Sequence, residues 1–234
     1  MSNQRRMDIH TRFAGNRGVL RSARWGAAVA VLALTTACSH VPGVYTIESR
    51  SDAQAAANRD VFDPAAYVDG VWDSKVVPAL TKATDASVVV AAIGEDPDAA
   101  GERYGHRPGV GGPFSYLVKG TGTVTKVDDG SATTPLTVRL EGTDDDVNIG
   151  TGQVIAGTAL RDAVGFISFS DFSNQLDYAD VATQLNDRVR SDVLDHLPTD
   201  RKELEGKQIT FSGAFSSLVP GTAMIVPVTL EVTP

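Results

Sequence analysis

The chain of 234 residues is long enough for one moderate domain with additional segments, and its 21 basic and 29 acidic residues give a formal net charge of −8. This acidic excess argues against nucleic acid as a partner, because nucleic-acid binding depends on Lys and Arg side chains that neutralise phosphates. The single cysteine, Cys38, excludes an internal disulfide.

Residues 1–37 have the pattern of a secretory signal peptide. Six arginines and one acidic residue, Asp8, precede the apolar run 25–34, and small residues follow that run. A basic region, a short apolar run and small residues before a cleavage point are the three parts of such a signal. The apolar run is shorter than the ~18 residues of a membrane-spanning helix. The sequence therefore predicts export, with initiation at Met1 or Met7.

Cys38 directly follows this signal, at the end of the run LTTAC. The run resembles the lipobox of bacterial lipoproteins, whose signal is cut before a cysteine that receives a diacylglyceryl group; it departs from the usual pattern at Thr35, where leucine is common. The resemblance implies lipid attachment at Cys38, and the alternative is an ordinary signal with an incidental cysteine. Two or more acyl chains hold a protein stably on a membrane. Residues 38–61 connect the lipidated cysteine to the rest of the chain and are expected to be a tether.

Cleavage before Cys38 also changes the charge of the protein. It removes six arginines and one aspartate, so the mature chain carries 15 basic and 28 acidic residues, a formal −13. Such a chain is not expected to hold anionic lipid through a polybasic surface. The expected membrane contact is the lipid itself.

Residues 62–112 are predicted to form a small helical subdomain. Asp63 is a favourable N-cap for the first helix, and Pro78 is expected to kink or end that helix. A second helix is predicted over 86–93 and a further helical turn over 98–104. A body of about fifty residues is too small to be stable alone, so we expect it to pack on the residues that follow.

From residue 113 the apolar period changes to two, which is typical of β-strands. The alternation predicts strands over 116–119, 122–127, 136–140, 147–149, 154–159, 206–213 and 224–232. The fourth and fifth of these are alternatively one strand bent at 150–152. Pro227 places the last strand at an edge or at a bulge, because proline cannot donate to a neighbouring strand.

One long helix is predicted between the strands. Five apolar residues recur every fourth position and share one helical stripe, namely Val181, Leu185, Val189, Val193 and Leu197. Three strand regions, a helix and two further strands follow the order of an OB-fold barrel. We therefore predict an α+β fold in which residues 113–234 form an OB-like small β-barrel plugged by the helix between its third and fourth strands. A different small barrel or a mixed α+β sheet is the alternative.

The segment before this helix carries the candidate ligand-binding residues. They combine aromatic rings with amide, carboxylate and guanidinium groups, a mixture that is common in binding pockets: Arg161, Asp162, Phe169, Asp171, Phe172, Asn174 and Gln175. The alternative is that the phenylalanines pack the end of the barrel while the polar groups satisfy backbone atoms at the turn and the helix cap.

No sequence pattern indicates catalysis, a metal or a cofactor. The four histidines are scattered, and HExxH and GxSxG are absent. The run 144–146 holds three aspartates that could bind calcium through carboxylate oxygens, and the alternative is a solvated hairpin turn. We expect no catalytic residue, no metal site and no cofactor.

Four segments resemble a family of predicted periplasmic lipoproteins of unknown function, found in bacteria that import sugars by ABC transporters. They are residues 62–78, 96–107, 157–186 and 206–215, of which 157–186 (GTALRDAVGFISFSDFSNQLDYADVATQLN) is the most specific. The resemblance implies export, lipidation and a role beside a sugar-uptake system. It implies no reaction.

The predicted function is that of a lipid-anchored periplasmic lipoprotein without catalytic activity, an accessory or binding component beside a carbohydrate ABC uptake system. Its expected partners are the membrane, through the lipid, and either ABC-transporter components or a carbohydrate. One alternative is a structural or interaction lipoprotein of the envelope with no small-molecule ligand. Another is an enzyme that its motifs do not reveal.

Overall fold

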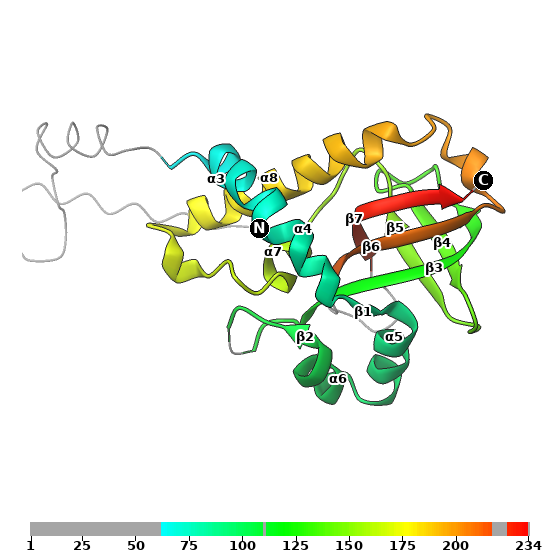
Figure 1. The fold of residues 1–234 in the computed structure, drawn as a ribbon, viewed down its shortest axis with the longest axis horizontal. Helices are drawn as coiled ribbons and strands as arrows, with labels where there is room; N and C mark the ends of the chain where they lie inside the picture. Colours follow the sequence, from blue (N-terminus) through cyan, green and yellow to red (C-terminus); the bar gives the residue numbers. More distant parts are fainter. Residues whose placement is uncertain (1–61, 110, 217–223, 234) are drawn as a thin grey trace, which may run out of the picture. The chain divides into compact units, whose positions relative to one another are not determined.

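Five strands form a closed barrel, and the longest of them is β3 (Figure 1). β3 (Ser115–Val127) pairs antiparallel with β4 (Pro135–Leu140) on one side and with β6 (Gln208–Ser216) on the other. β4 pairs antiparallel with β5 (Asp146–Gly150), which pairs parallel with β7 (Met224–Thr233), and β7 returns antiparallel to β6. This closed order, with a helix between β5 and β6, is that of an OB-fold barrel. The predicted α+β fold class is confirmed.

The computed structural model describes residues 62–109, 111–216 and 224–233. The predicted signal peptide (1–37), the predicted tether (38–61) and Cys38 lie outside the described residues. Among the residues described, no helix has the length and apolar character needed to cross a bilayer.

The barrel interior is filled by alternate residues of its strands. Val118, Val138, Ile149, Ile209 and Phe211 are buried there in one apolar cluster. The period of two places these side chains on one face of each strand, which is why the alternation in the sequence located the strands. The two strands predicted over 116–119 and 122–127 are parts of the single strand β3.

β7 contains a bulge at the proline noted in the sequence. Pro227 lies opposite Gly213, and the register shifts before the next pair, Ser212 with Thr229. A Cβ atom on Gly213 would collide with the backbone oxygen of Val226, so only glycine fits this close approach. Of the two positions predicted for Pro227, the bulge is the one observed.

The strand predicted over 154–159 is absent from that segment, which is irregular up to α7 (Ala159–Ala163). The backbone amides of Thr151, Gly152 and Val154 donate to carbonyl oxygens of the β3–β4 loop, at residues 132–134. The hydrogen bonds at the start of this segment thus go to a loop and not to a neighbouring strand, and the segment does not form a β-ladder.

The first helical segment continues through its proline. α3 (Pro64–Val71) leads into the π-helical turn η2 (Trp72–Val76) and then α4 (Val77–Ala79). Within the π-helical turn the amide of Val77 donates to the carbonyl oxygen of Trp72, one residue further back than in an α-helix. Of the two outcomes expected at Pro78, a kink or an end of the helix, the end at Val77 is not observed. The regular α-helix is instead interrupted by the widened turn directly before the proline, which lacks an N–H group.

Residues 62–112 divide between two apolar cores. α5 (Ala86–Glu95) and α6 (Pro97–Tyr104), the helices predicted over 86–93 and 98–104, contribute to the barrel core, whereas α3 and η2 belong to the second core. The short strands β1 (Thr84–Asp85) and β2 (Gly105–His106) both pair with β3. The part of this segment from Thr84 onward is thus joined to the barrel, whereas its first helices pack in the second core.

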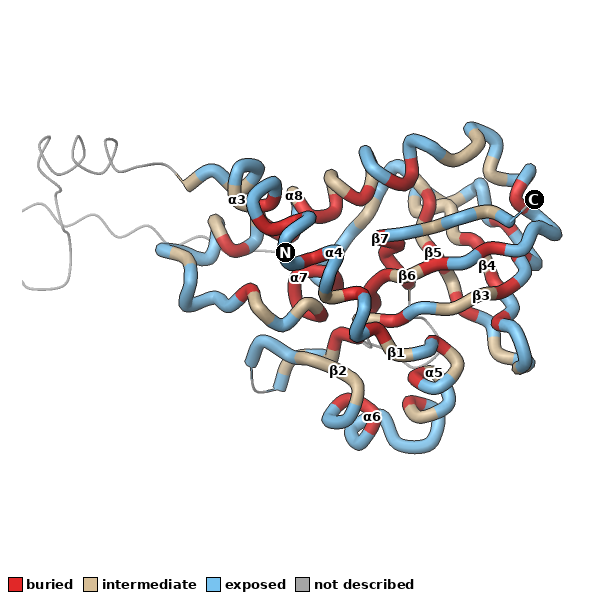
Figure 2. The backbone as a smooth tube through the Cα atoms, in the orientation of Figure 1, coloured by how far each residue is buried: buried red, intermediate tan, exposed pale blue. Residues whose placement is uncertain are grey.

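The long helix α8 (Gln175–Asp192) does not plug the barrel. Its buried stripe, with Leu185 at the centre, belongs to the second core, together with Trp72 and residues from the outer face of β6 and β7. Figures 1 and 2 show α8 running beside β7 with buried residues along its length. Four residues of the predicted stripe are buried and Leu197 is half-buried, but the helix ends at Asp192 and packs outside the strands. Leu204, in the turn η6 (Arg201–Leu204), reaches the barrel core instead.

Candidate functional site

Two of the predicted ligand residues, Arg161 and Asp162, form a buried ion pair on α7. Nε and Nη2 of Arg161 lie 2.8 and 2.7 Å from Oδ1 of Asp162. Nη1 donates to the backbone oxygen of Tyr178 at 3.1 Å, and the guanidinium lies 3.6 Å from the centre of the Tyr178 ring. Hydrogen bonds and a cation–π contact thus tie α7 to the first turn of α8.

The remaining contacts of Asp162 also come from within the protein. Thr158 Oγ1 donates to Oδ2 at 2.6 Å, and the Tyr178 hydroxyl lies 3.4 Å from Oδ1. Burial raises the pKa of the Tyr178 phenol, so it stays protonated and can donate. His106 Nδ1, on β2, donates to the backbone oxygen of Asp162 at 2.7 Å. Arg161 and Asp162 therefore have partners already, and a ligand role for them stays a prediction.

Three further predicted ligand residues lie at turn and cap positions. Asp171 accepts a hydrogen bond from the backbone amide of Ser168 at 2.9 Å. Asn174 is the N-cap of α8 and accepts from the amides of Leu176 and Asp177, both at 2.9 Å. Gln175 is the exposed first residue of the helix. This is the geometry of the alternative interpretation, in which polar groups satisfy the backbone. A ligand role for these three residues stays a prediction.

The phenylalanines of this segment join an aromatic cluster of the second core. The ring of Phe172 packs at 5.3 Å from Phe62, 5.5 Å from Tyr67 and 5.6 Å from Tyr178. Phe169 contacts Tyr178 edge-on at 5.7 Å and remains 53% exposed. The structure thus brings Arg161, Phe169 and Phe172 together around Tyr178, a residue that was not among the predicted site residues.

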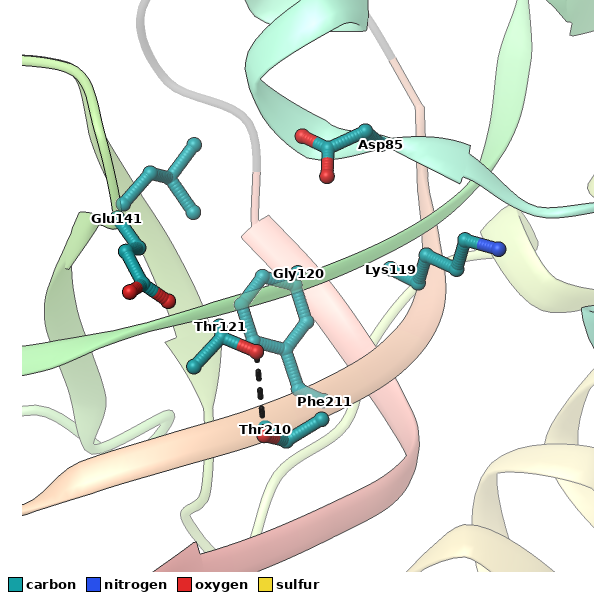
Figure 3. Close-up of a pocket in the computed structure, with 8 residues that line it drawn as sticks. Asp85, Lys119, Gly120, Thr121, Glu141, Thr210 and Phe211 are labelled. Carbon is teal, nitrogen blue, oxygen red and sulfur yellow. Dashed lines mark hydrogen bonds between the residues drawn. The ribbon is translucent and has the colours of Figure 1, made fainter.

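A polar groove of about 440 Å³ opens elsewhere, on the barrel surface (Figure 3). β1 pairs with β3 only at Val118 and Lys119, and β4 begins to pair with it at Gly122. The groove lies along the stretch of β3 between these two pairings. Its lining residues are Asp85, Lys119, Gly120, Thr121, Leu140, Glu141, Thr210 and Phe211.

The floor of the groove is the ring of Phe211 beneath Gly120. A Cβ atom on Gly120 would come within 3.0 Å of that ring, so the glycine lets the ring pack directly against the strand. Figure 3 shows Asp85 and Glu141 on different sides of the ring, and the hydroxyl groups of Thr121 and Thr210 joined by a hydrogen bond of 3.2 Å. The groove therefore presents carboxylate and hydroxyl groups over an apolar floor.

The charged groups at the rim differ in how far they are engaged. The carboxylate of Asp85 caps α5 by accepting from the amide and the hydroxyl of Ser87, at 2.9 and 2.6 Å. Within the described ranges, neither Lys119 nor Glu141 forms an ion pair. These two side chains remain available to a ligand. Sequence reasoning missed the groove because its residues come from four separate segments and share no spacing.

A second cleft of about 440 Å³ is mostly apolar. It lies between the β3–β4 loop, the end of β5, the segment 154–159 and the start of β7, and its lining includes Val154, Ile155, Met224 and Ile225. Hydroxyl groups of Thr133, Thr158 and Ser216 are its side-chain polar atoms. None of the predicted ligand residues lines either of these two hollows.

The acidic turn at 144–146 has a basic neighbour. Nε of Arg139 lies 2.5 Å from Oδ1 of Asp146, and Nη1 lies 3.8 Å from Asp144. The hydrogen bond from Arg139 lowers the pKa of Asp146. In the part of the chain that the structure covers, no three His, Cys, Asp or Glu side chains gather as a metal-binding group.

Comparisons with known proteins place the chain. The crystal structure of an OB-fold protein from Thermotoga maritima is similar over 74% of this chain and 100% of its own, with a TM-score of 0.59 and 21% sequence identity. This likeness supports the fold alone. No curated protein sequence matches significantly. The family of predicted periplasmic lipoproteins, DUF2291, matches residues 28–231. Because this match covers most of the sequence, from the apolar run of the signal to β7, the chain belongs to that family and is a periplasmic lipoprotein with a lipid anchor.

Proposed function

We propose that this lipoprotein is a non-catalytic accessory protein that binds a carbohydrate beside a sugar ABC uptake system. The observation that carries the proposal is the polar groove between β1 and β4, with Lys119 and Glu141 at its rim. Its volume of about 440 Å³ is within the range of small-molecule pockets, about 300–1,000 Å³. OB-fold barrels commonly bind ligands across their second and third strands, here β4 and β5, so this groove, lined mainly by β3 and β6, would be a different binding surface.

The groups of the groove match the hydrogen-bonding needs of a sugar. A carboxylate accepts hydrogen bonds from hydroxyl groups, an ammonium donates to them, and a threonine hydroxyl does both. Glu141, Lys119 and the pair Thr121 and Thr210 supply these three kinds of group. The Phe211 ring is only 1% exposed, so it supports the groove from below and is not a stacking surface. Recognition would therefore depend on hydroxyl contacts.

A titration of the mature chain against pentoses, hexoses and sugar alcohols tests this proposal. We expect calorimetric heat with at least one sugar, and weaker binding in Lys119→Met, because hydrogen bonds to charged groups contribute about 1.5–3 kcal/mol, which is roughly a tenfold or larger change in Kd. The matched control is Lys126→Met, since Lys126 is exposed on the same strand but does not line the groove.

Three outcomes of this titration are informative. Absence of heat with every sugar contradicts the carbohydrate proposal. Equal affinity of the Lys119→Met and Lys126→Met variants contradicts the location in the groove. Loss of binding in Gln175→Ala with an unchanged Lys119→Met variant would instead support the loop before α8, the site that the sequence predicted.

A second candidate function is that of an envelope lipoprotein that acts through surface contacts and binds no small molecule. The observation that favours it is the exposure of Phe169 and Leu176, at 53% and 69%. Large apolar side chains that remain exposed to water can mark interaction surfaces. Under this alternative the groove variants leave the activity of the protein in the cell unchanged.

A further inference from the structure

The most exposed large apolar side chains of the described residues lie at one end of α8. Phe169 is 53% exposed and Leu176 is 69% exposed. Phe169 opens the short turn η4 (Phe169–Asp171), and Leu176 is in the first turn of α8. We call Phe169 and Leu176 together the apolar tip.

The apolar tip is held in place by well-formed local structure. The Asp171 carboxylate accepts from the amide of Ser168, and Asn174 accepts from the amide of Leu176 itself. The Phe169 ring rests on Tyr178, whose ring is held by the guanidinium of Arg161. Both apolar side chains are thus presented by an ordered turn, so little conformational entropy is lost when they bind.

The chain enters the domain next to the apolar tip. Phe62 is the first residue that the structure describes, and its ring packs 5.3 Å from Phe172 in the same turn region. Cys38 is the single cysteine of the sequence and the predicted site of the lipid, and 23 residues lie between it and Phe62. The surface around Phe62 is therefore the place where the covalent connection to the membrane leaves the domain.

The anchor by itself does not orient the domain. A chain of 23 residues spans up to roughly 80 Å when extended, so contacts of the domain decide which surface faces the bilayer. Attachment to the same membrane raises the local concentration of lipid around the domain, and a weak apolar contact then suffices for stable seating.

Charge determines which kind of lipid contact is compatible with the tip. Asp63, Asp171 and Asp177 belong to the turns that carry Phe62, Phe169 and Leu176. These carboxylates oppose attraction to anionic headgroups. An apolar contact with neutral lipid has no such cost, because it depends on the transfer of Phe and Leu side chains from water.

We propose that the apolar tip contacts the bilayer to which Cys38 is anchored and seats the domain with the α8 N-terminus toward the membrane. Aromatic and leucine side chains of membrane-surface segments enter the boundary between headgroups and acyl chains by about 5–10 Å. The proposal rests on the lipid anchor and is independent of any carbohydrate ligand.

Fluorescence quenching by lipid tests this contact in the intact lipidated protein. Trp25 precedes Cys38, so the mature chain has one tryptophan, Trp72, which is buried. In vesicles of phosphatidylcholine brominated near the start of its acyl chains, Phe169→Trp is expected to add blue-shifted emission that the bromine quenches several-fold more than it quenches the control. The matched control is Val88→Trp, because Val88 is 44% exposed on α5, a helix whose buried residues belong to the barrel core and not to the second core.

Leu176→Trp provides a second, independent position and should be quenched like Phe169→Trp. Replacing part of the neutral lipid by phosphatidylglycerol should reduce quenching at both positions. Quenching of Phe169→Trp and Leu176→Trp that does not exceed that of Val88→Trp overturns the proposal and leaves the tip to a protein partner. An increase with phosphatidylglycerol overturns the apolar mechanism.

Discussion

Replacing Leu185 by alanine is expected to lower the free energy of unfolding by about 2–5 kcal/mol, the usual cost of a large cavity in a packed core. Leu185 is fully buried in the second core, to which α3, α7 and the outer face of β6 and β7 also contribute. For a domain of this size, 1 kcal/mol corresponds to roughly 2–4 °C in Tm. Thermal unfolding of the mature chain should therefore shift down by roughly 5–20 °C.

Two positions on the same helix provide controls for Leu185→Ala. Leu176→Ala removes the same side chain at an exposed position and should change stability by about 0.5 kcal/mol or less. Asn174→Ala removes the N-cap and should cost about 0.5–2 kcal/mol. If Asn174→Ala lowers the free energy of unfolding more than Leu185→Ala does, the turn before α8 contributes more to stability than the second core, which contradicts this account.

Replacing Arg161 by methionine is expected to destabilise the domain by about 3–5 kcal/mol, because the carboxylate of Asp162 is then left buried without its cation. The change also removes the hydrogen bond to the Tyr178 backbone and the contact with the Tyr178 ring. Denaturant unfolding measures the loss. The matched control is Arg139→Met, whose pair with Asp146 lies at the surface and should contribute about 1 kcal/mol or less.

A double variant separates structure from binding at this position. Arg161→Met combined with Asp162→Leu removes both charges and should recover part of the stability lost in Arg161→Met. If Arg161→Met unfolds like the parent protein but no longer binds a sugar that the parent binds, Arg161 is a ligand residue. That result would contradict the structural role assigned here to the ion pair.

The barrel could be predicted from the sequence because its signals are local. Alternating apolar residues marked the strands, and the order of strands and helix indicated the OB-like topology. The same kind of signal failed for the position of α8. A stripe every fourth residue shows that one face of the helix is buried, but it does not show what that face packs against. Here the partners are Trp72, more than a hundred residues before Leu185, and outer residues of β6 and β7, about thirty or more residues after it.

The candidate site was less predictable because its residue types are ambiguous. Arg161 and Asp162 suit a binding pocket and a buried ion pair equally well, and the choice depends on Tyr178, 17 residues further along the chain from Arg161. The groove is formed by the way the strands pair, and no sequence motif marks it. Asp85, Lys119 and Glu141 meet only because β1 and β4 leave a gap along β3, and no spacing in the sequence records that gap.

The anchored state of the protein, on which its proposed role at the membrane depends, is tested most directly by Cys38→Ser. The parent protein should be cut before Cys38, carry lipid on that residue by mass spectrometry, and sediment with membranes. The Cys38→Ser variant should remain uncut at that position and should lose the lipid. Processing of the variant at the same position, with the same partition into membranes as the parent, would contradict lipid attachment at Cys38.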